Sequence, residues 1–195
     1  MKYLEKEVVI FMAIFLALNL LCSCEFERKK LKEDIVIMQS RPIMLPVDSM
    51  LCWWYGNDTL SFKSNNEALN FVVFSDSTKC SSCALKGMYI WDDFLQKIGY
   101  NYPEGLNVFF IFTPLQKDWK SFYITMKTIP PSIPIYVDTL GVFNRNNRHI
   151  PSNPELHTFL LDSNGYVLLV GNPLENEKIE KLFWQILEEK LGKRE

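Results

Sequence analysis

The chain has 195 residues, of which 48% are hydrophobic and 23% charged, and this composition excludes a disordered tail or a collagen-like repeat. Lys and Arg number 21 against 23 for Asp and Glu, so the formal net charge is −2 and gives no electrostatic footprint for nucleic acid. The five cysteines are too few for a small disulfide-dense scaffold, and their positions in the chain carry most of its functional information.

The N-terminal segment predicts a secretory signal over residues 1–23. Its apolar run, VVIFMAIFLALNLL over residues 8–21, is shorter than the roughly 20 apolar residues that a membrane span needs. The run ends in Leu21-Cys22-Ser23-Cys24, which resembles the lipobox of bacterial lipoproteins. The resemblance implies cleavage after Ser23 and lipidation of Cys24, and the alternative is a signal anchor that is never cleaved. Either outcome places the rest of the chain outside the cytoplasm, where disulfides can form.

Residues 24–34 are highly charged with few apolar side chains, and we interpret them as a tether behind the lipid. Acyl chains on one residue hold a protein firmly to a bilayer. We therefore expect a protein of the bacterial cell envelope, lipid-anchored to a membrane and facing the periplasm or the cell surface.

Residues 35–195 have the pattern of one α/β domain. Two short apolar runs, broken by prolines and by Gly56-Asn57-Asp58, predict a leading β-hairpin over residues 35–66. Beyond it, continuous apolar runs alternate with amphipathic patterns in the order β-α-β-α-β-β-α, which predicts a central mixed sheet flanked by helices. The expected strands are 69–75, 106–112, 133–137, 158–162 and 166–170. The expected helices cover 83–98, begin at Thr113-Pro114, and run from Asn172 to Leu191. Residues 141–156 form the one long irregular connection.

The chemistry is predicted at Cys80 and Cys83, a CxxC motif between the strand over 69–75 and the helix after it. A thiolate attacks disulfides, and the first turn of a helix stabilises a thiolate with its unpaired N–H groups. Lys79 adjoins Cys80 and Lys86 lies one turn beyond Cys83, so both add positive charge nearby. Cys83 faces the same side as Cys80 and can resolve a mixed disulfide formed there.

The element order, the CxxC at a strand–helix junction and the block HTFLLDSNGYVLLVGNP with its following helix resemble the thioredoxin-fold lipoproteins of the TlpA/ResA group, over residues 68–191. The resemblance implies a thiol–disulfide oxidoreductase with Cys80 attacking and Cys83 resolving. It also implies that no cofactor is needed, and that the partners are protein thiols or disulfides or a membrane redox protein.

Two positions depart from the thioredoxin pattern. The place of the cis-proline that packs against the active cysteines is taken by His157, followed by Thr158, and both are expected to contact substrate. A cis bond before a non-proline residue costs about 3 kcal/mol, so we expect a trans bond there. The buried acid six residues before the first cysteine is replaced by Phe74, whereas Asp76 is nearer to the pair and can cap the turn.

Two other functions stay open. The Sco copper-assembly proteins also combine a thioredoxin fold, a cysteine pair and a histidine followed by threonine, so Cys80, Cys83 and His157 would form a soft three-ligand copper set. The Sco pair, however, has a different spacing, and a histidine at the rim of a sheet is more often structural. The chain can also be a binding lipoprotein that keeps the fold with little turnover.

The remaining cysteine and histidine are expected to have no part in the chemistry. Cys52 is followed by Trp53, Trp54 and Tyr55, which favours a buried position in the leading hairpin. His149 lies in the irregular connection and is expected at the surface.

Overall fold

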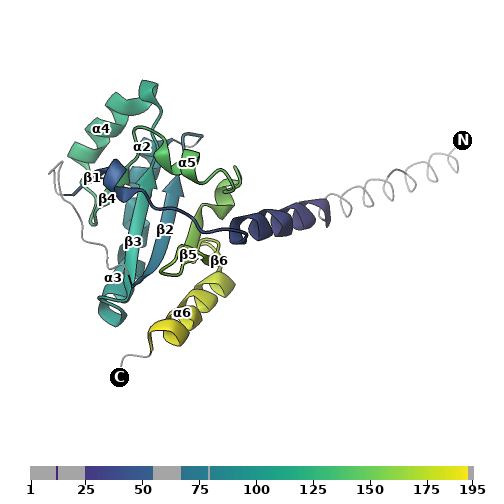
Figure 1. Ribbon diagram of the computed structural model, residues 1–195. Helices are drawn as coiled ribbons and strands as arrows, with labels where there is room; N and C mark the ends of the chain where they lie inside the picture. Colours follow the sequence, from purple (N-terminus) through teal and green to yellow (C-terminus); the bar gives the residue numbers. More distant parts are fainter. Residues whose placement is uncertain (1–11, 13–24, 55–66, 79, 193–195) are drawn as a thin grey trace, which may run out of the picture. The chain divides into compact units, whose positions relative to one another are not determined.

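The computed structural model describes residue 12 and residues 25–54, 67–78 and 80–192 (Figure 1). The chain divides into two compact units, residues 1–37 and residues 38–195. Residues 25–39 are helical, so the segment predicted as a tether has helical structure. The predicted cleavage site and Cys24 lie outside the described residues. In the part of the chain that is described, no helix combines the length and the apolar character needed to cross a membrane.

The second unit is built on a six-stranded mixed sheet with the order β1-β4-β3-β2-β5-β6 (Figure 1). The central strands β2, β3 and β4 run parallel to one another, while β1, β5 and β6 are antiparallel to their neighbours. The strands are β1 (Leu51–Trp53), β2 (Leu69–Ser75), β3 (Leu106–Phe112), β4 (Ile135–Val137), β5 (Thr158–Leu161) and β6 (Val167–Val170).

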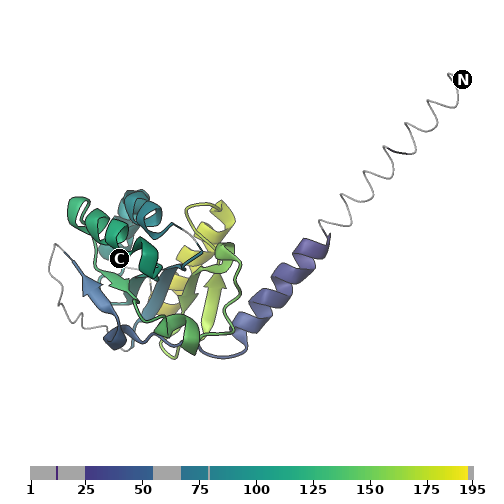
Figure 2. The same cartoon turned by 90° about the horizontal axis from the view of Figure 1, so that it is seen from above.

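Helices cover both faces of this sheet (Figure 2). On one face, Phe71 of β2 packs against Trp91 and, with ring centroids 5.1 Å apart, against Phe183. On the other face, Phe74 of the same strand packs against Phe143, with centroids 4.7 Å apart. The first face carries α2 (Ser81–Lys86), η2 (Gly87–Trp91), α3 (Asp92–Asn101), α4 (Trp119–Thr128) and α6 (Glu177–Leu191), and the second carries α5 (Val142–Asn146). Burial on both faces explains the continuous apolar strands.

The strand order β3-β2-β5-β6, with a helical crossover between parallel β2 and β3 and an antiparallel hairpin before the last helix, is the thioredoxin-like arrangement. The predicted fold class is therefore confirmed. The strand β4, which follows α4, extends the sheet beyond β3, and β1 pairs antiparallel with the outer edge of β4. The first apolar run of the predicted leading hairpin over residues 35–66 is not a strand, because residues 35–39 are helical, and β1 in its second run pairs with β4. Residues 55–66 lie outside the described residues.

Two helices begin later than the sequence predicts, and the first of them is α4. Thr113 is not a helix cap, because its N–H donates to the carbonyl of Ser75 (3.0 Å) and continues the ladder between β2 and β3. The chain stays extended through Leu115, and α4 begins at Trp119 after a short 3-10 turn, η3 (Gln116–Asp118). The predicted single helix over 83–98 is divided into α2, η2 and α3.

The last helix begins at Glu177, not at Asn172. Asn172 instead closes a turn, in which its Oδ1 accepts from the N–H of Leu174 and its Nδ2 donates to Glu175. Asn176 is the cap, with Oδ1 accepting from the backbone N–H groups of the second and third residues after it, at 3.0 and 3.3 Å. The helix ends where predicted, at Gly192, whose φ of 83° suits glycine.

The connection over residues 141–156 is more regular than predicted. It contains α5 and a 3-10 turn, η4 (Pro154–Leu156). Fully buried Asp138 caps α5, because its two carboxylate oxygens accept from the N–H groups of Val142 (2.9 Å) and Phe143 (2.8 Å). Asp138 precedes residues 141–156, so the sequence of that segment alone does not reveal the residue that caps α5.

Candidate functional site

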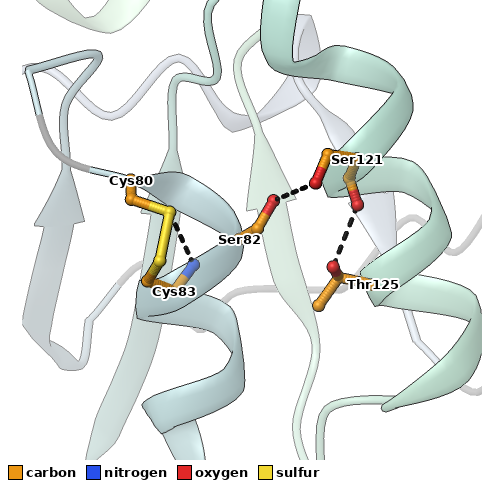
Figure 3. Close-up of a disulfide and its surroundings, with 5 residues drawn as sticks. All are labelled: Cys80, Ser82, Cys83, Ser121 and Thr125. Atoms are coloured by element: carbon orange, nitrogen blue, oxygen red, sulfur yellow. Dashed lines mark hydrogen bonds between the residues drawn. A yellow bond between two sulfur atoms is a disulfide. The ribbon is translucent and has the colours of Figure 1, made fainter.

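Cys80 and Cys83 form a disulfide at the start of α2, with their Cα atoms 5.2 Å apart (Figure 3). Cys80 is the N-cap residue, and the N–H of Cys83 donates to its Sγ at 3.2 Å. Both cysteines are exposed to solvent. A hydrogen bond from an N–H group favours the charged form of a thiol, so the donor that a Cys80 thiolate would need is already in place.

A tight turn leads from β2 into this pair. Asp76 is buried, and its Oδ1 accepts from both the N–H (3.0 Å) and the hydroxyl (2.6 Å) of Thr78. The acid therefore caps the turn, as the sequence suggested. Lys79 lies outside the described residues. Lys86 is exposed in the last turn of α2, at the end of the helix away from Cys80.

A polar contact that the sequence did not indicate joins α2 to α4. The hydroxyl oxygens of Ser82 and Ser121 lie 3.3 Å apart, and Thr125 donates from Oγ1 to the carbonyl of Ser121 at 2.9 Å (Figure 3). Ser82 is the residue between the two cysteines that faces α4. Two serines 39 positions apart carry no sequence signal, so only the packing of α4 beside α2 reveals the contact.

His157 lies immediately before β5 and is buried. Its carbonyl accepts from the N–H of Phe74 (2.8 Å), its Nε2 lies 2.8 Å from the carbonyl of Pro151, and its ring packs on that of Phe74 with centroids 5.1 Å apart. The structure has no cis peptide bond among the residues it describes, so the expected trans bond is confirmed. The two departures from the thioredoxin pattern, His157 and Phe74, are thus in direct contact and form one altered unit.

The three residues of the proposed copper set do not converge. Within residues 25–54, 67–78 and 80–192, no group of three or more His, Cys, Asp or Glu side chains is placed to hold a metal ion. Cys80 and Cys83 belong to the exposed start of α2, whereas the imidazole of His157 is directed to Pro151 and Phe74 in the interior.

A cavity of about 510 Å³ lies between the sheet and the α2–η2 segment that follows the cysteine pair. Ala84, the residue after Cys83, forms part of its wall, and His157 and Thr158 form another part. The remaining lining comes from the ends of β2 and β3, from η2 and η4, and from the turn before α6. The two positions predicted to contact substrate, His157 and Thr158, therefore border the same cavity as Ala84, the residue after Cys83.

The remaining histidine and cysteine are both buried. His149 is only 5% exposed, so the surface position predicted for it is wrong. Burial, and then the positive charge of Arg41, lower its pKa below the ordinary value of 6.5. His149 is buried because its loop is held against the domain by Asn147. The Asn147 side chain accepts from the N–H of Met44 and donates to its carbonyl, both at 2.8 Å. Cys52 is free and buried, as predicted, and burial raises the pKa of its thiol.

No protein-family model matches the sequence, and no curated protein matches it. Among solved structures, it is similar to a candidate thiol:disulfide interchange protein DsbE from Chlorobium tepidum, with 22% identity over 63% of this chain and 82% of that chain, and a TM-score of 0.45. It is similar to a thioredoxin-like protein from Porphyromonas gingivalis, with 17% identity over 76% and 95% of the two chains and a TM-score of 0.46. It is also similar to StoA from Bacillus subtilis, with 18% identity over 62% of this chain and 84% of that chain, and a TM-score of 0.43. Because these identities and scores are low, the chemistry must be inferred from the chain's own strand order and cysteine pair.

Proposed function

We propose that this thioredoxin-like chain is a membrane-anchored thiol–disulfide oxidoreductase that acts outside the cytoplasm. The observation that carries the proposal is the exposed Cys80–Cys83 disulfide at the start of α2, with a backbone N–H directed at the sulfur of Cys80. Exposed disulfides are the labile and catalytic ones, whereas structural disulfides are usually protected.

The exchange needs only the two cysteines. With the pair reduced, the Cys80 thiolate attacks one sulfur of a substrate disulfide, and the other substrate sulfur leaves as a thiolate that takes up a proton. Cys83 then loses its proton and attacks Sγ of Cys80, which forms the Cys80–Cys83 disulfide and releases the second substrate thiol. Two electrons pass from the pair to the substrate. The same steps in reverse oxidise a substrate dithiol.

Other residues of the site have supporting roles in this proposal. Lys79, next to Cys80 in the chain, supplies positive charge that favours the thiolate, and His157 with Thr158 forms part of the wall along which substrate lies. The anchor is the lipid on Cys24. Palmitate labelling in a bacterial host tests it, because Cys24→Ala is expected to lose the label and to leave the membrane fraction, and a labelled variant would contradict this assignment.

The two cysteines have different expected roles, and matched variants separate them. Cys83→Ser is expected to accumulate a mixed disulfide with a substrate peptide, since the nucleophile is present and the resolving thiol is absent. Cys80→Ser is expected to accumulate none, and Cys52→Ser is expected to behave like the unmodified chain. Mass spectrometry after quenching with acid measures each product. Equal trapping by Cys80→Ser and Cys83→Ser would contradict the assignment, and no trapping by any variant would contradict the proposed function itself.

A further inference from the structure

We propose that the cavity beside α2 receives a basic side chain, lysine or arginine, of the protein substrate, and that the oxidoreductase therefore prefers cysteines with a basic residue nearby. The inference rests on the proposed function and adds a substrate class to it. It depends on the place of the cavity, on the chemistry of its lining and on its charge.

The cavity is close enough to the cysteine pair to contact the substrate residues that flank a reacting cysteine. Ala84 in its wall is bonded to Cys83 along the chain, and the N–H of Ala84 donates to the carbonyl of Cys80 at 3.0 Å. A substrate in mixed disulfide with the pair would therefore have its neighbouring side chains at the mouth of this space. The volume of about 510 Å³ exceeds what one long side chain needs.

The interior of the cavity suits an aliphatic stem. Met88, Trp91, Phe110 and Phe112 are all buried residues of its lining, and they present apolar surface. Ser75 adds one polar group to this wall. It is 8% exposed, and its hydroxyl has no hydrogen-bond partner among the described residues. Lysine and arginine combine an apolar stem with N–H donors at the tip.

The charged residues of the lining have one sign. Glu155 of η4 and Glu175 in the turn before α6 both line the cavity, and among the residues that the structure describes its lining includes no lysine or arginine. Glu175 is held in place by the side chain of Asn172, whose Nδ2 donates to its Oε1 at 2.9 Å. A cation is therefore the charged group that these walls complement, and an acidic substrate side chain would be repelled.

The test compares peptides that differ only in charge. Disulfide-linked peptides carry arginine at successive positions on either side of the cysteine, and a matched series carries citrulline, which has the same shape and no charge. The second-order rate constant for reduction by the reduced protein is measured for each. At the best position, the arginine peptide is expected to react about fivefold faster, which is the effect of a partly exposed ion pair. The preference is expected to shrink in high salt.

Variants assign the preference to the cavity. The double variant E155Q/E175Q keeps the shape of both side chains and is expected to bring the arginine-to-citrulline ratio close to one. E188Q/E189Q removes the same charge from the exposed last turn of α6 and is expected to keep the ratio of the unmodified protein. Exchange of the pair with glutathione verifies that each variant is folded and active.

Two results would overturn the inference. One is equal rates for arginine and citrulline peptides at every position, and the other is a preference that survives unchanged in E155Q/E175Q. In both cases the reduction of the peptides themselves would leave the proposed function standing. Failure to reduce any peptide would instead contradict the proposed function.

Discussion

Cysteines lie on both sides of the sheet, but in different environments. On the α2 side, Cys80 and Cys83 are exposed and disulfide-bonded at the start of a helix. On the α5 side, Cys52 lies in a row of directly paired residues that crosses the sheet through Tyr136 and Ile111 to Phe74, so all four share that face. Cys52 and both histidines are buried. Environment, and not residue type, therefore decides which cysteine can do chemistry.

Alkylation of the reduced protein is expected to show the largest difference between the two faces. Burial raises the pKa of Cys52 and hides its sulfur, whereas Cys80 is exposed with an N–H donor on its sulfur. Iodoacetamide at neutral pH is expected to modify Cys80 more than about 100-fold faster than Cys52, since the thiolate is the reactive form. Mass spectrometry of peptides gives both rates. In guanidinium chloride the two rates are expected to converge, and comparable rates in the folded protein would contradict the contrast between the faces.

The contact between Phe74 and His157 is expected to be a structural element. Phe74 is 5% exposed and contacts the rings of Phe143 and His157. Phe74→Ala is expected to lower the free energy of unfolding by about 3–5 kcal/mol, because it removes a large buried ring. Leu115→Ala, at a residue that is 40% exposed, is expected to cost less than about 1 kcal/mol. Urea titrations measure both, and a cost for Phe74→Ala as small as that for Leu115→Ala would show that this contact is not part of the core.

His149, which is buried after α5, is expected to make the free energy of unfolding depend on pH. Its lowered pKa means that the folded chain binds this proton more weakly than the unfolded chain does. The free energy of unfolding is therefore expected to be highest above the ordinary pKa of 6.5 and to fall as the pH drops through that value toward the lower pKa of the folded state. His149→Gln removes this titration, so its difference from the unmodified chain is expected to be larger at about pH 7.5 than at about pH 5. Urea titrations at the two pH values check this, and an equal difference at both would contradict it.

The smallest expected effect is at the contact between α2 and α4. Ser121→Ala removes the partner of the Ser82 hydroxyl at an exposed position. A neutral hydrogen bond contributes about 0.5–1.5 kcal/mol to stability. Because this one is exposed, Ser121→Ala is expected to lower the free energy of unfolding by the lower end of that range or less. Thermal unfolding measures the loss. A loss of stability as large as that of Phe74→Ala would contradict the minor role expected for this contact.

The fold could be predicted from the sequence because the apolar runs match the strands closely. The strands β2 and β3 have the predicted bounds, because buried parallel strands leave an uninterrupted apolar signal. Helix starts were harder to place. Thr113-Pro114 and Asn172-Pro173 have the composition of helix caps, but tertiary hydrogen bonds, Thr113 to Ser75 and the turn closed by Asn172, use those positions differently.

For the site, the sequence predicted the cysteine pair and the replacement of the cis-proline by His157. It could not predict that His157 packs on Phe74, since the two lie far apart in the chain and meet only through the register of β2 and β5. The glutamates of the cavity were missed for the same reason. Glu155 and Glu175 are unremarkable in sequence, and only the turns before β5 and α6 bring them to one space.

An equilibrium redox titration of the Cys80–Cys83 pair decides whether the exposed disulfide is catalytic or structural. The purified protein is equilibrated in glutathione and dithiothreitol buffers, and the fraction of disulfide is counted by thiol trapping and mass spectrometry. We predict one reversible two-electron transition at a potential above about −300 mV, the range of catalytic pairs, and its loss in Cys80→Ser but not in Cys52→Ser. A pair that stays oxidised to potentials well below that value would be a structural disulfide and would contradict the proposed oxidoreductase function.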